Sequence, residues 1–378
     1  MEKIRICQMI DRPSLGGGQT ALLLLAENLD PRLFEVFVCS GSDGPLVDEV
    51  RSRGLTHIPV PLSKTLKLST VRQTARALEK NGIQILHTHG GIAGFYGRWA
   101  ARRSRTPVIV HTLHGIHYLH YRNPLLKNLY IFQERKFSRF TDGLILVSQA
   151  DLRQAKKHRL GPEDKMFVIP NGTELKLEGN DDERQKKRRE LGWEPENPVI
   201  GTVARLHRQK GVFYLVKAAE RVLRDFPRAK IVLVGEGPLG QKLRKTALKM
   251  GLEGKLFFLG ERKEAVELMS LFDIFVLPSL WEGLPFVLVE AATLGIPIIA
   301  TAVDGVAEII EDRETGLLVP PEDSQALADA IIRLLMDKES AFRLAERAKA
   351  LIPARFPLRR MVDQTQNLYL KLYQRKAN

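Results

Sequence analysis

The sequence predicts an α/β protein with two Rossmann-like domains, each built on a parallel β-sheet wrapped by helices. Three observations predict this fold class. The chain has 378 residues, and one hydrophobic core rarely serves more than about 250–300 residues. Apolar, β-branched runs alternate with helical stretches along the chain, which favours parallel sheets covered by helices. A charged stretch at 174–190 divides these runs into two series.

The two series define the expected domains, residues 1–173 and 174–355. In the first domain we predict strands at 4–10, 35–39, 56–60, 83–87, 108–112, 143–147 and 167–169. In the second we predict strands at 199–203, 230–234, 255–259, 274–277, 297–300 and 316–318. Residues 356–378 have apolar side chains at helical spacing, and we expect a C-terminal helix that packs back onto the first domain. Such sheets bind ligands beyond the carboxyl ends of their strands, so we expect the site in a cleft between the domains.

The composition is typical of a globular protein rather than a disordered or membrane-spanning one. Hydrophobic residues make up 44% and charged residues 27% of the chain, both ordinary values for folded domains. The apolar patch at 22–25 is far shorter than the roughly 20 residues of a membrane span. The N-terminus lacks a signal peptide's apolar region, and two cysteines in so long a chain indicate a reducing compartment. We therefore expect a cytoplasmic protein, free or peripheral at the inner face of the plasma membrane.

The net charge of +14 at pH 7 favours an anionic partner. Nucleic acid, acidic lipid and phosphorylated metabolites would each satisfy this charge. RNA-binding folds present stacking aromatics on a sheet face, and the sequence has no such motif, so we expect no nucleic-acid partner. The segment 118–139 interleaves leucine and aromatic residues with arginine and lysine, which suits a surface lying on anionic lipid. An ordinary amphipathic helix with a basic exposed face is the alternative.

Residues 278–290 form the most informative motif, because they carry two carboxylates at the end of a predicted strand. We predict a short loop with Glu282, then a helix whose first turn contains Pro285 and whose C-terminal cap is Gly295. Glu290 would then lie among apolar neighbours on the helix, which is costly unless some group donates a hydrogen bond to it. It either has a backbone or lysine partner or binds ligand hydroxyls.

Four positions at strand ends of the second domain suit a diphosphate. The backbone amides of Gly283 and Leu284 stand ahead of a helix, where anions bind. Arg205 and Lys210 follow the predicted strand at 199–203, close enough to share one diphosphate. Arginine offers a fixed fork of donors and lysine a mobile point charge. In so basic a chain two surface cations are a weak signal alone, and their place at a strand's carboxyl end favours the ligand interpretation.

A run of three glycines, Gly16, Gly17 and Gly18, follows the first predicted strand and precedes a helix. Glycines let the backbone approach a phosphate or sugar closely, and the helix end supplies amides. With Ala21 the spacing also fits the loose dinucleotide fingerprint, which needs an acid about 20 residues further on. The second strand ends without a carboxylate until Asp43, which weakens a nicotinamide interpretation. A purely structural turn is the other alternative.

Six of the nine histidines lie between positions 87 and 120. Clustered histidines can indicate a metal site, but no cysteine ligand or paired acid lies near them in the sequence. A loop also gives the pattern His-x-x-His-x-x-His no fixed geometry, so we expect no metal. His114 precedes a glycine at the mouth of the expected cleft and is the histidine predicted to contact substrate.

Together these motifs resemble those of the retaining nucleotide-sugar glycosyltransferases of family 4, which have the GT-B fold. The resemblance covers essentially the whole chain, and it depends on segments 16–18, 169–172, 203–211, 235–238 and 278–290. It implies two residues at the reacting centre. Glu282 would hold the hydroxyls of the donor sugar, and His114 would lie near the reacting carbon.

The resemblance also implies a set of donor-binding residues, which are Gly17, Gly18, Arg205, Lys210, Glu261, Arg262, Glu282, Gly283, Leu284 and Glu290. Glu290 would bind the ribose hydroxyls, and the backbone at Glu261 and Arg262 would meet the base. The two cations and the glycine-rich backbone would bind the diphosphate.

In this family the donor keeps its anomeric configuration and no metal is needed, and the sequence contains no Asp-x-Asp metal motif. We therefore predict a retaining hexosyltransferase without cofactor that moves a sugar from a nucleoside diphosphate sugar to a hydroxyl acceptor. The acceptor would be phosphorylated, lipid-linked or a saccharide, as in lipopolysaccharide, exopolysaccharide or glycolipid synthesis. A nucleotide-sugar epimerase of similar fold, an NAD-dependent oxidoreductase and a non-enzymatic lipid- or nucleic-acid-binding protein are the alternatives. The base, the sugar and the acceptor stay open.

Overall fold

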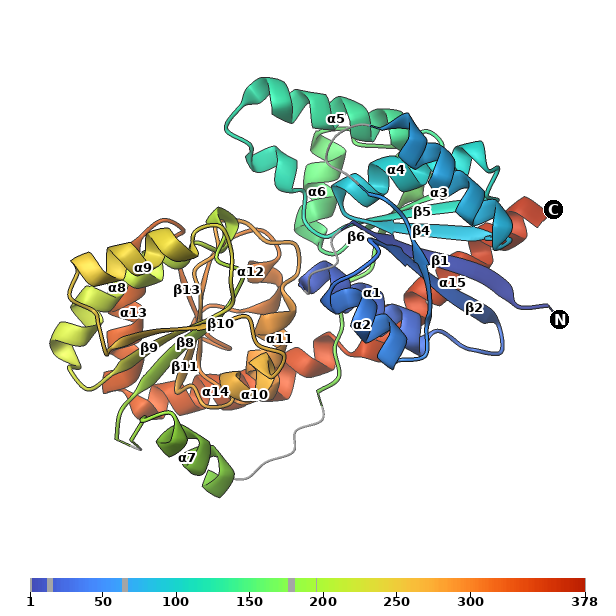
Figure 1. The fold of residues 1–378 in the computed structure, drawn as a ribbon. Helices are drawn as coiled ribbons and strands as arrows, with labels where there is room; N and C mark the ends of the chain where they lie inside the picture. The colour runs from blue at the N-terminus through green and yellow to red at the C-terminus, as the bar shows by residue number, and fades with distance from the viewer. Residues whose placement is uncertain (1, 12–15, 63–66, 176–180, 195, 378) are drawn as a thin grey trace. The chain divides into compact units, whose positions relative to one another are not determined.

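The computed structural model describes residues 2–11, 16–62, 67–175, 181–194 and 196–377. The chain divides into two compact units, Met1–Gly172 together with Leu358–Asn378, and Thr173–Pro357. In each unit helices cover a parallel β-sheet (Figure 1). The predicted fold class, α/β with two Rossmann-like sheets, is confirmed.

The described residues of the first unit form a seven-stranded sheet in the order β3-β2-β1-β4-β5-β6-β7. Its strands are β1 (Ile4–Ile10), β2 (Phe34–Ser40), β3 (Thr56–Pro59), β4 (Ile85–His89), β5 (Val108–Leu113), β6 (Gly143–Leu146) and β7 (Met166–Val168). Its helices are α1 (Gly17–Asn28), α2 (Pro45–Ser52), α3 (Leu68–Lys80), α4 (Gly91–Arg103), α5 (Pro124–Ser138), α6 (Gln149–Lys157) and α15 (Leu358–Ala377), with the short turns η1 (His117–His120) and η2 (Glu163–Lys165).

The second unit contains a six-stranded sheet in the order β10-β9-β8-β11-β12-β13. Its strands are β8 (Val199–Val203), β9 (Lys230–Val234), β10 (Leu256–Gly260), β11 (Ile274–Leu277), β12 (Ile298–Thr301) and β13 (Leu317–Val319). Its helices are α7 (Asp181–Glu190), α8 (Val212–Asp225), α9 (Gly240–Lys249), α10 (Ala265–Met269), α11 (Phe286–Thr293), α12 (Val306–Ile309), α13 (Ser324–Met336) and α14 (Lys338–Arg355), with the turn η3 (Arg208–Lys210).

Alternating side chains of the first sheet bury its two faces against different helices. On one face Cys7 and Leu86 belong to a core shared with α3 and α4. On the other face Ile6 and Ile85 pack with α1 and α15, including Tyr369 of α15. Since side chains of a strand point alternately to opposite faces, continuous apolar runs are needed when both faces are buried. The C-terminal helix α15 therefore completes the core of the first unit (Figure 1).

The strand orders place certain loops side by side. In the second unit β8 and β11 are neighbours although about 70 residues separate them, and in the first unit β1 neighbours β4. Ligands of doubly wound sheets bind outside the carboxyl ends of the strands at such a reversal of strand order. The motifs after β8 and β11 therefore meet at one edge of the second sheet.

Two local predictions were wrong. The strand predicted at 83–87 is shifted, because β4 continues to His89, which pairs with Ile10 of β1. Thr88 and His89 are buried and hydrogen-bonded, so their polarity does not end the strand. Pro285 is the N-cap residue of α11 and lies just before its first turn. Gly295, predicted as the C-terminal cap, follows the C-cap residue Leu294 with a φ of +68°.

Candidate functional site

The loops after β8 and β11 are held together by close backbone contacts. Gly211 has a φ of +57°, and a Cβ at this position would lie 1.8 Å from the carbonyl oxygen of Pro278, so only glycine fits. Leu280 donates its amide hydrogen to the Gln209 carbonyl at 2.7 Å. The side-chain nitrogen Nε2 of Gln209 donates to the Trp281 carbonyl at 3.1 Å. These contacts fix the backbone of the two loops that contain Lys210 and Glu282.

Glu282 is buried, with 5% of its surface exposed, and it lies at the centre of a polar cluster. Its Oε1 accepts hydrogen bonds from Lys210 Nζ at 2.5 Å and from Ser279 Oγ at 2.6 Å. Its backbone amide donates to Asp304 Oδ2 at 3.1 Å. No described residue donates to Oε2. The structure thus brings Lys210 and Glu282 together and leaves one oxygen of the carboxylate for another donor.

Glu290 lies in α11 among apolar residues, as the sequence predicts. Burial raises the pKa of its carboxyl to about 7. Within the described residues its side chain has no hydrogen-bond or ion-pair partner. The alternative of a backbone or lysine partner therefore finds no support, and the carboxylate is available for ligand hydroxyls. Gly283 and Leu284 are buried in the loop that joins Glu282 to this helix.

Arg205 is exposed and is the second residue after the end of β8. The glycine loop after β9 packs against the backbone on both sides of it. A Cβ at Gly235 would lie 2.2 Å from the Ala204 carbonyl oxygen, and one at Gly237 would lie 2.5 Å from that of Leu206. These glycines are therefore explained by close packing of two loops, which keeps the arginine at the carboxyl end of the sheet.

Glu261 and Arg262 follow β10 and are exposed. Arg262 donates to the Leu259 carbonyl at 2.9 Å and forms a 3.7 Å ion pair with Glu264. Because β10 is the outermost strand and β9 separates it from β8, these two residues lie to the side of the Lys210–Glu282 pair. Their proposed role at the base stays a prediction.

In the first unit the glycine loop and the predicted histidine are in contact. Gly17 begins α1, and a Cβ at Gly18 would lie 3.5 Å from Cδ2 of His114. His114 Nε2 lies 2.9 Å from Nδ1 of His89, and the two rings stack. Burial lowers the pKa of His114 to about 4, so the ring is uncharged at neutral pH. Its Nδ1 is buried and has no hydrogen-bond partner among the described residues.

The described histidines do not gather as metal ligands, since no group of three or more His, Cys, Asp or Glu side chains in the described ranges is placed to hold an ion. His87 and His89 instead hydrogen-bond to Tyr369 and Gln8. Sequence reasoning missed these two partners, and it missed Ser279 and Asp304 beside Glu282. The Asp304-Gly305 pair was an available signal, because such pairs favour tight turns, and Asp304 has a φ of +34°.

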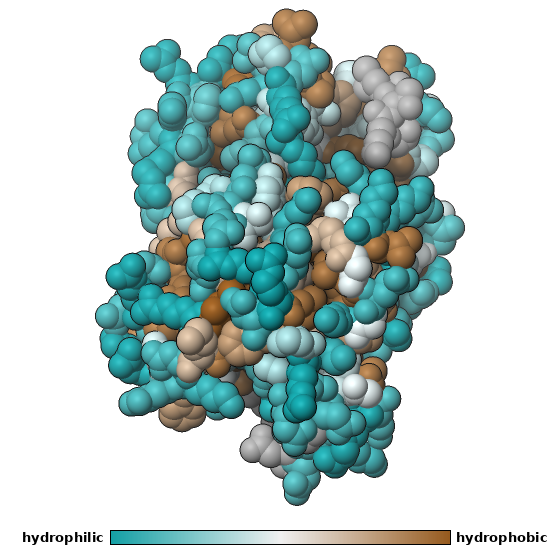
Figure 2. Space-filling view, turned by 90° about the vertical axis from the view of Figure 1, so that its left-hand side faces the viewer, coloured by the Kyte–Doolittle hydropathy of each residue, from teal (hydrophilic) through white to brown (hydrophobic). Residues whose placement is uncertain are grey.

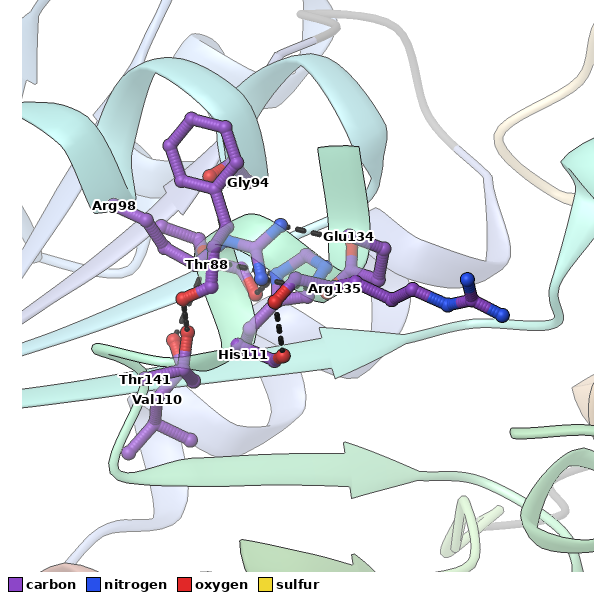
Figure 3. A network of polar contacts seen from close by, with 10 residues as sticks. Thr88, Gly94, Arg98, Val110, His111, Glu134, Arg135 and Thr141 are labelled. Atoms are coloured by element: carbon purple, nitrogen blue, oxygen red, sulfur yellow. Dashed lines mark hydrogen bonds and ion pairs between the residues drawn. The ribbon is translucent and has the colours of Figure 1, made fainter. Parts of the chain in front are cut away.

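The segment at 118–139 forms η1 and α5, and a buried ion pair holds α5 against α4. Arg98 of α4 donates to Glu134 of α5 at 2.6 and 2.9 Å, and to the Gly94 carbonyl at 2.8 Å (Figure 3). Both charged side chains are buried, and Arg98 also lies over the Phe137 ring. The opposite side of α5 exposes large apolar side chains, which are Leu125, Leu126, Leu129 and Phe132.

Among the described residues no helix combines the length and the hydrophobicity needed to cross a bilayer. The face seen in Figure 2 is mostly hydrophilic, with smaller hydrophobic areas between the polar side chains.

Comparison with known proteins assigns this chain and its fold to a class. A family model described as Glycosyltransferase Family 4 matches residues 15–177, and one described as Glycosyl transferases group 1 matches residues 183–351. The structure of Anabaena Alr3699/HepE in complex with UDP-glucose is similar with a TM-score of 0.87 at 23% identity, over 97% of this chain and 100% of that chain. The fold is GT-B, as the resemblance implied.

The sequence relatives are glycosyltransferases as well. An Escherichia coli UDP-Gal:alpha-D-GlcNAc-diphosphoundecaprenol alpha-1,3-galactosyltransferase is 28% identical over 98% of this chain and 97% of its own length. A D-inositol 3-phosphate glycosyltransferase of Corynebacterium glutamicum (strain R) is 30% identical over 71% of this chain and 68% of its own length. The chain belongs to glycosyltransferase family 4. It is a GT-B glycosyltransferase, and the epimerase, oxidoreductase and non-enzymatic alternatives have no support.

Proposed function

We propose that this glycosyltransferase acts with retention and without a metal, moving a hexosyl group from a nucleoside diphosphate sugar to a hydroxyl acceptor. The observation that carries the proposal is the buried Glu282 carboxylate, whose Oε1 is neutralised by Lys210 while Oε2 is left for a sugar hydroxyl. Glu290 on the adjoining helix has no partner among the described residues, which supports ribose binding.

The donor is a uridine diphosphate sugar in this proposal. Support comes from the Escherichia coli relative, whose name gives UDP-Gal as donor, and from the HepE structure with UDP-glucose. The base would contact the backbone at Glu261 and Arg262, and Arg205 with Lys210 would bind the diphosphate. The acceptor is a lipid-linked, phosphorylated or saccharide hydroxyl of lipopolysaccharide, exopolysaccharide or glycolipid synthesis, by analogy with the diphosphoundecaprenol acceptor of that relative.

The reaction we propose takes place on one face of the sugar. The bond from the anomeric carbon to the phosphate oxygen lengthens toward an oxocarbenium ion, and negative charge grows on the departing diphosphate. Arg205, Lys210 and the N-terminus of α11 stabilise this charge, which is the task a metal has in other transferases. The acceptor hydroxyl attacks from the same face, and the departing phosphate oxygen takes its proton. His114 contacts the substrate near the reacting carbon.

The test is transfer with purified protein, UDP-galactose or UDP-glucose, and undecaprenyl diphosphate-linked N-acetylglucosamine as acceptor. We expect UDP release that depends on the acceptor, an α-linked product by NMR, and unchanged rates in EDTA. A β-linked product would refute retention, and loss of activity in EDTA that a divalent cation restores would refute metal independence. Conversion of the nucleotide sugar without any acceptor would support an epimerase instead.

We also propose that α5 docks on an anionic membrane surface at the inner face of the plasma membrane. Its exposed apolar residues stand beside cations; Lys136 Nζ lies 5.6 Å from the Phe132 ring centre. Amphipathic helices with leucine, aromatic and basic residues bind in this way, with affinity that rises with anionic lipid content.

This docking is tested by sedimentation with vesicles of phosphatidylglycerol and phosphatidylcholine. Leu129→Ser should lower binding about tenfold or more, since about 1.5–3 kcal/mol accompanies the burial of one such side chain. Leu248→Ser, at an exposed leucine of α9 in the other unit, is the matched control. Equal binding by wild type and Leu129→Ser, or equal binding to neutral vesicles, would refute the docking.

A further inference from the structure

A chain of hydrogen bonds runs through the core of the first unit and ends at His114. His114 Nε2 lies 2.9 Å from His89 Nδ1, and His89 Nε2 lies 2.8 Å from Gln8 Oε1. The amide nitrogen of Gln8 donates to the Tyr369 hydroxyl at 2.9 Å. The same hydroxyl lies 2.5 Å from His87 Nδ1, and His87 Nε2 lies 2.6 Å from Thr112 Oγ1.

The donors at the links between Gln8 and His114 follow from the orientation of the Gln8 amide. Because its nitrogen donates to Tyr369, its oxygen faces His89, so His89 Nε2 must carry a hydrogen. Burial lowers the pKa of His89 well below its ordinary value, so the ring is neutral and its Nδ1 has only a lone pair. His114 Nε2 must then donate to that lone pair. The second nitrogen of His114, Nδ1, is left as an acceptor.

The surroundings give these rings no room to turn. Gln8, His87 and His89 are almost completely buried, and the rings of His87 and His89 lie 4.1 Å apart. The cavity beside His114, His89 and Thr112 has a volume of about 20 Å³, which suffices for a single water molecule. His114 Nδ1 itself is buried without a partner among the described residues. A buried acceptor without a partner costs free energy, and this cost is relieved when a hydrogen-bond donor such as a hydroxyl reaches it.

We propose that Gln8, His89 and Tyr369 are positioning residues that fix His114 in the tautomer with hydrogen on Nε2, so that Nδ1 accepts a hydrogen bond from a substrate hydroxyl. The substrate contact rests on the proposed function, whereas the tautomer does not. The assignment gives the C-terminal helix α15 a part in the active site through Tyr369, although the helix itself need not touch substrate. The tautomer is set by a residue 255 positions away in the sequence (369 minus 114).

The full-length protein labelled with ¹⁵N-histidine tests the tautomer directly, because nitrogen chemical shifts distinguish a protonated from a bare ring nitrogen. His114→Gln identifies the signals of this ring. We expect hydrogen on Nε2 and a bare Nδ1 throughout pH 6–8. Hydrogen on Nδ1 in the wild type would overturn the proposal, whatever the activity. Acceptor-dependent transfer by that same protein would leave the proposed function standing.

Tyr369→Phe keeps the ring and removes the hydroxyl that orients Gln8. We expect a mixture of His114 tautomers and a fall in kcat of about fivefold or more, with little change in KM for the donor. Tyr373→Phe is the matched control, because Tyr373 of the same helix accepts from Gln84 at 2.6 Å outside this chain. It should lose stability without altering the His114 signals. Gln8→Met, of similar volume but without an amide, should act like Tyr369→Phe and replaces it if that variant does not fold. Unchanged His114 signals in the folded variant would overturn the proposal.

Discussion

Replacing Glu290 with glutamine should stabilise the protein and weaken donor binding, with both effects depending on pH. Burial raises the pKa of this carboxyl from an ordinary 4.5 to about 7. The stability provided by the protonated group is therefore fully present below pH 4.5 and is lost as pH rises through 7. The difference of about 2.5 (7 minus 4.5) corresponds to about 3 kcal/mol. Glu290→Gln should raise the free energy of unfolding by up to this amount at pH 8 and hardly at pH 4.5.

Donor binding should become stronger as pH rises, since ribose hydroxyls donate to the ionised carboxylate. With a pKa of about 7, about one protein molecule in 11 is ionised at pH 6, so the apparent Kd of UDP-glucose should be about tenfold weaker there than at pH 8. UDP-glucose is the suitable ligand, because its diphosphate is a diester with no proton to exchange near neutral pH. Glu290→Gln should bind more weakly, with no such pH dependence.

Calorimetric titration with UDP-glucose and urea unfolding, each at pH 6 and pH 8, measure the two effects on the same protein preparations. Equal wild-type affinity at both pH values would refute the ribose role of Glu290. A glutamine variant no more stable than wild type at pH 8 would refute the raised pKa on which the reasoning depends.

Two further predictions concern the neighbours of Glu282. Lys210→Ala should lower kcat/KM and so raise the activation free energy by about 2–4 kcal/mol, as expected for the loss of one group that stabilises developing negative charge. Near-normal turnover would place the diphosphate elsewhere. Asp304→Gly should relieve a left-handed backbone conformation yet lower kcat, because the acceptor for the Glu282 amide is lost. Asp304→Asn, which tolerates the same φ and keeps a side-chain acceptor, should retain activity, and identical kinetics of the two variants would contradict this role.

Much of the fold followed from the sequence, because strands buried on both faces read as continuous apolar runs. The runs at 199–203 and 274–277 became β8 and β11 with the predicted bounds. The error at β4 arises because strands are recognised by such apolar runs. Thr88 and His89 interrupt the run, although both are buried in the strand and hydrogen-bonded inside the core.

The site was predictable only where its groups stand close in sequence or follow neighbouring strands. Glu282 and Lys210 follow adjacent strands, so their proximity could be inferred from the motifs. The histidines could not be interpreted in the same way. Whether His87 is a metal ligand or a core residue depends on Tyr369, which lies 282 positions away and whose packing no local pattern reveals.

The hydrogen bonds of Glu282 also bear on how the sugar is transferred. A covalent route would need this carboxylate as a nucleophile, yet its Oε1 is bound by the Lys210 ammonium and by the Ser279 hydroxyl. Both bonds stabilise the charge on the carboxylate and thereby lower its nucleophilicity, while Oε2 stays able to accept a hydroxyl hydrogen. We therefore expect no sugar on Glu282 when the protein is quenched during turnover with UDP-glucose and its peptides are analysed by mass spectrometry. A peptide containing Glu282 with the mass of one added hexosyl group would establish a covalent intermediate and rule out same-face attack.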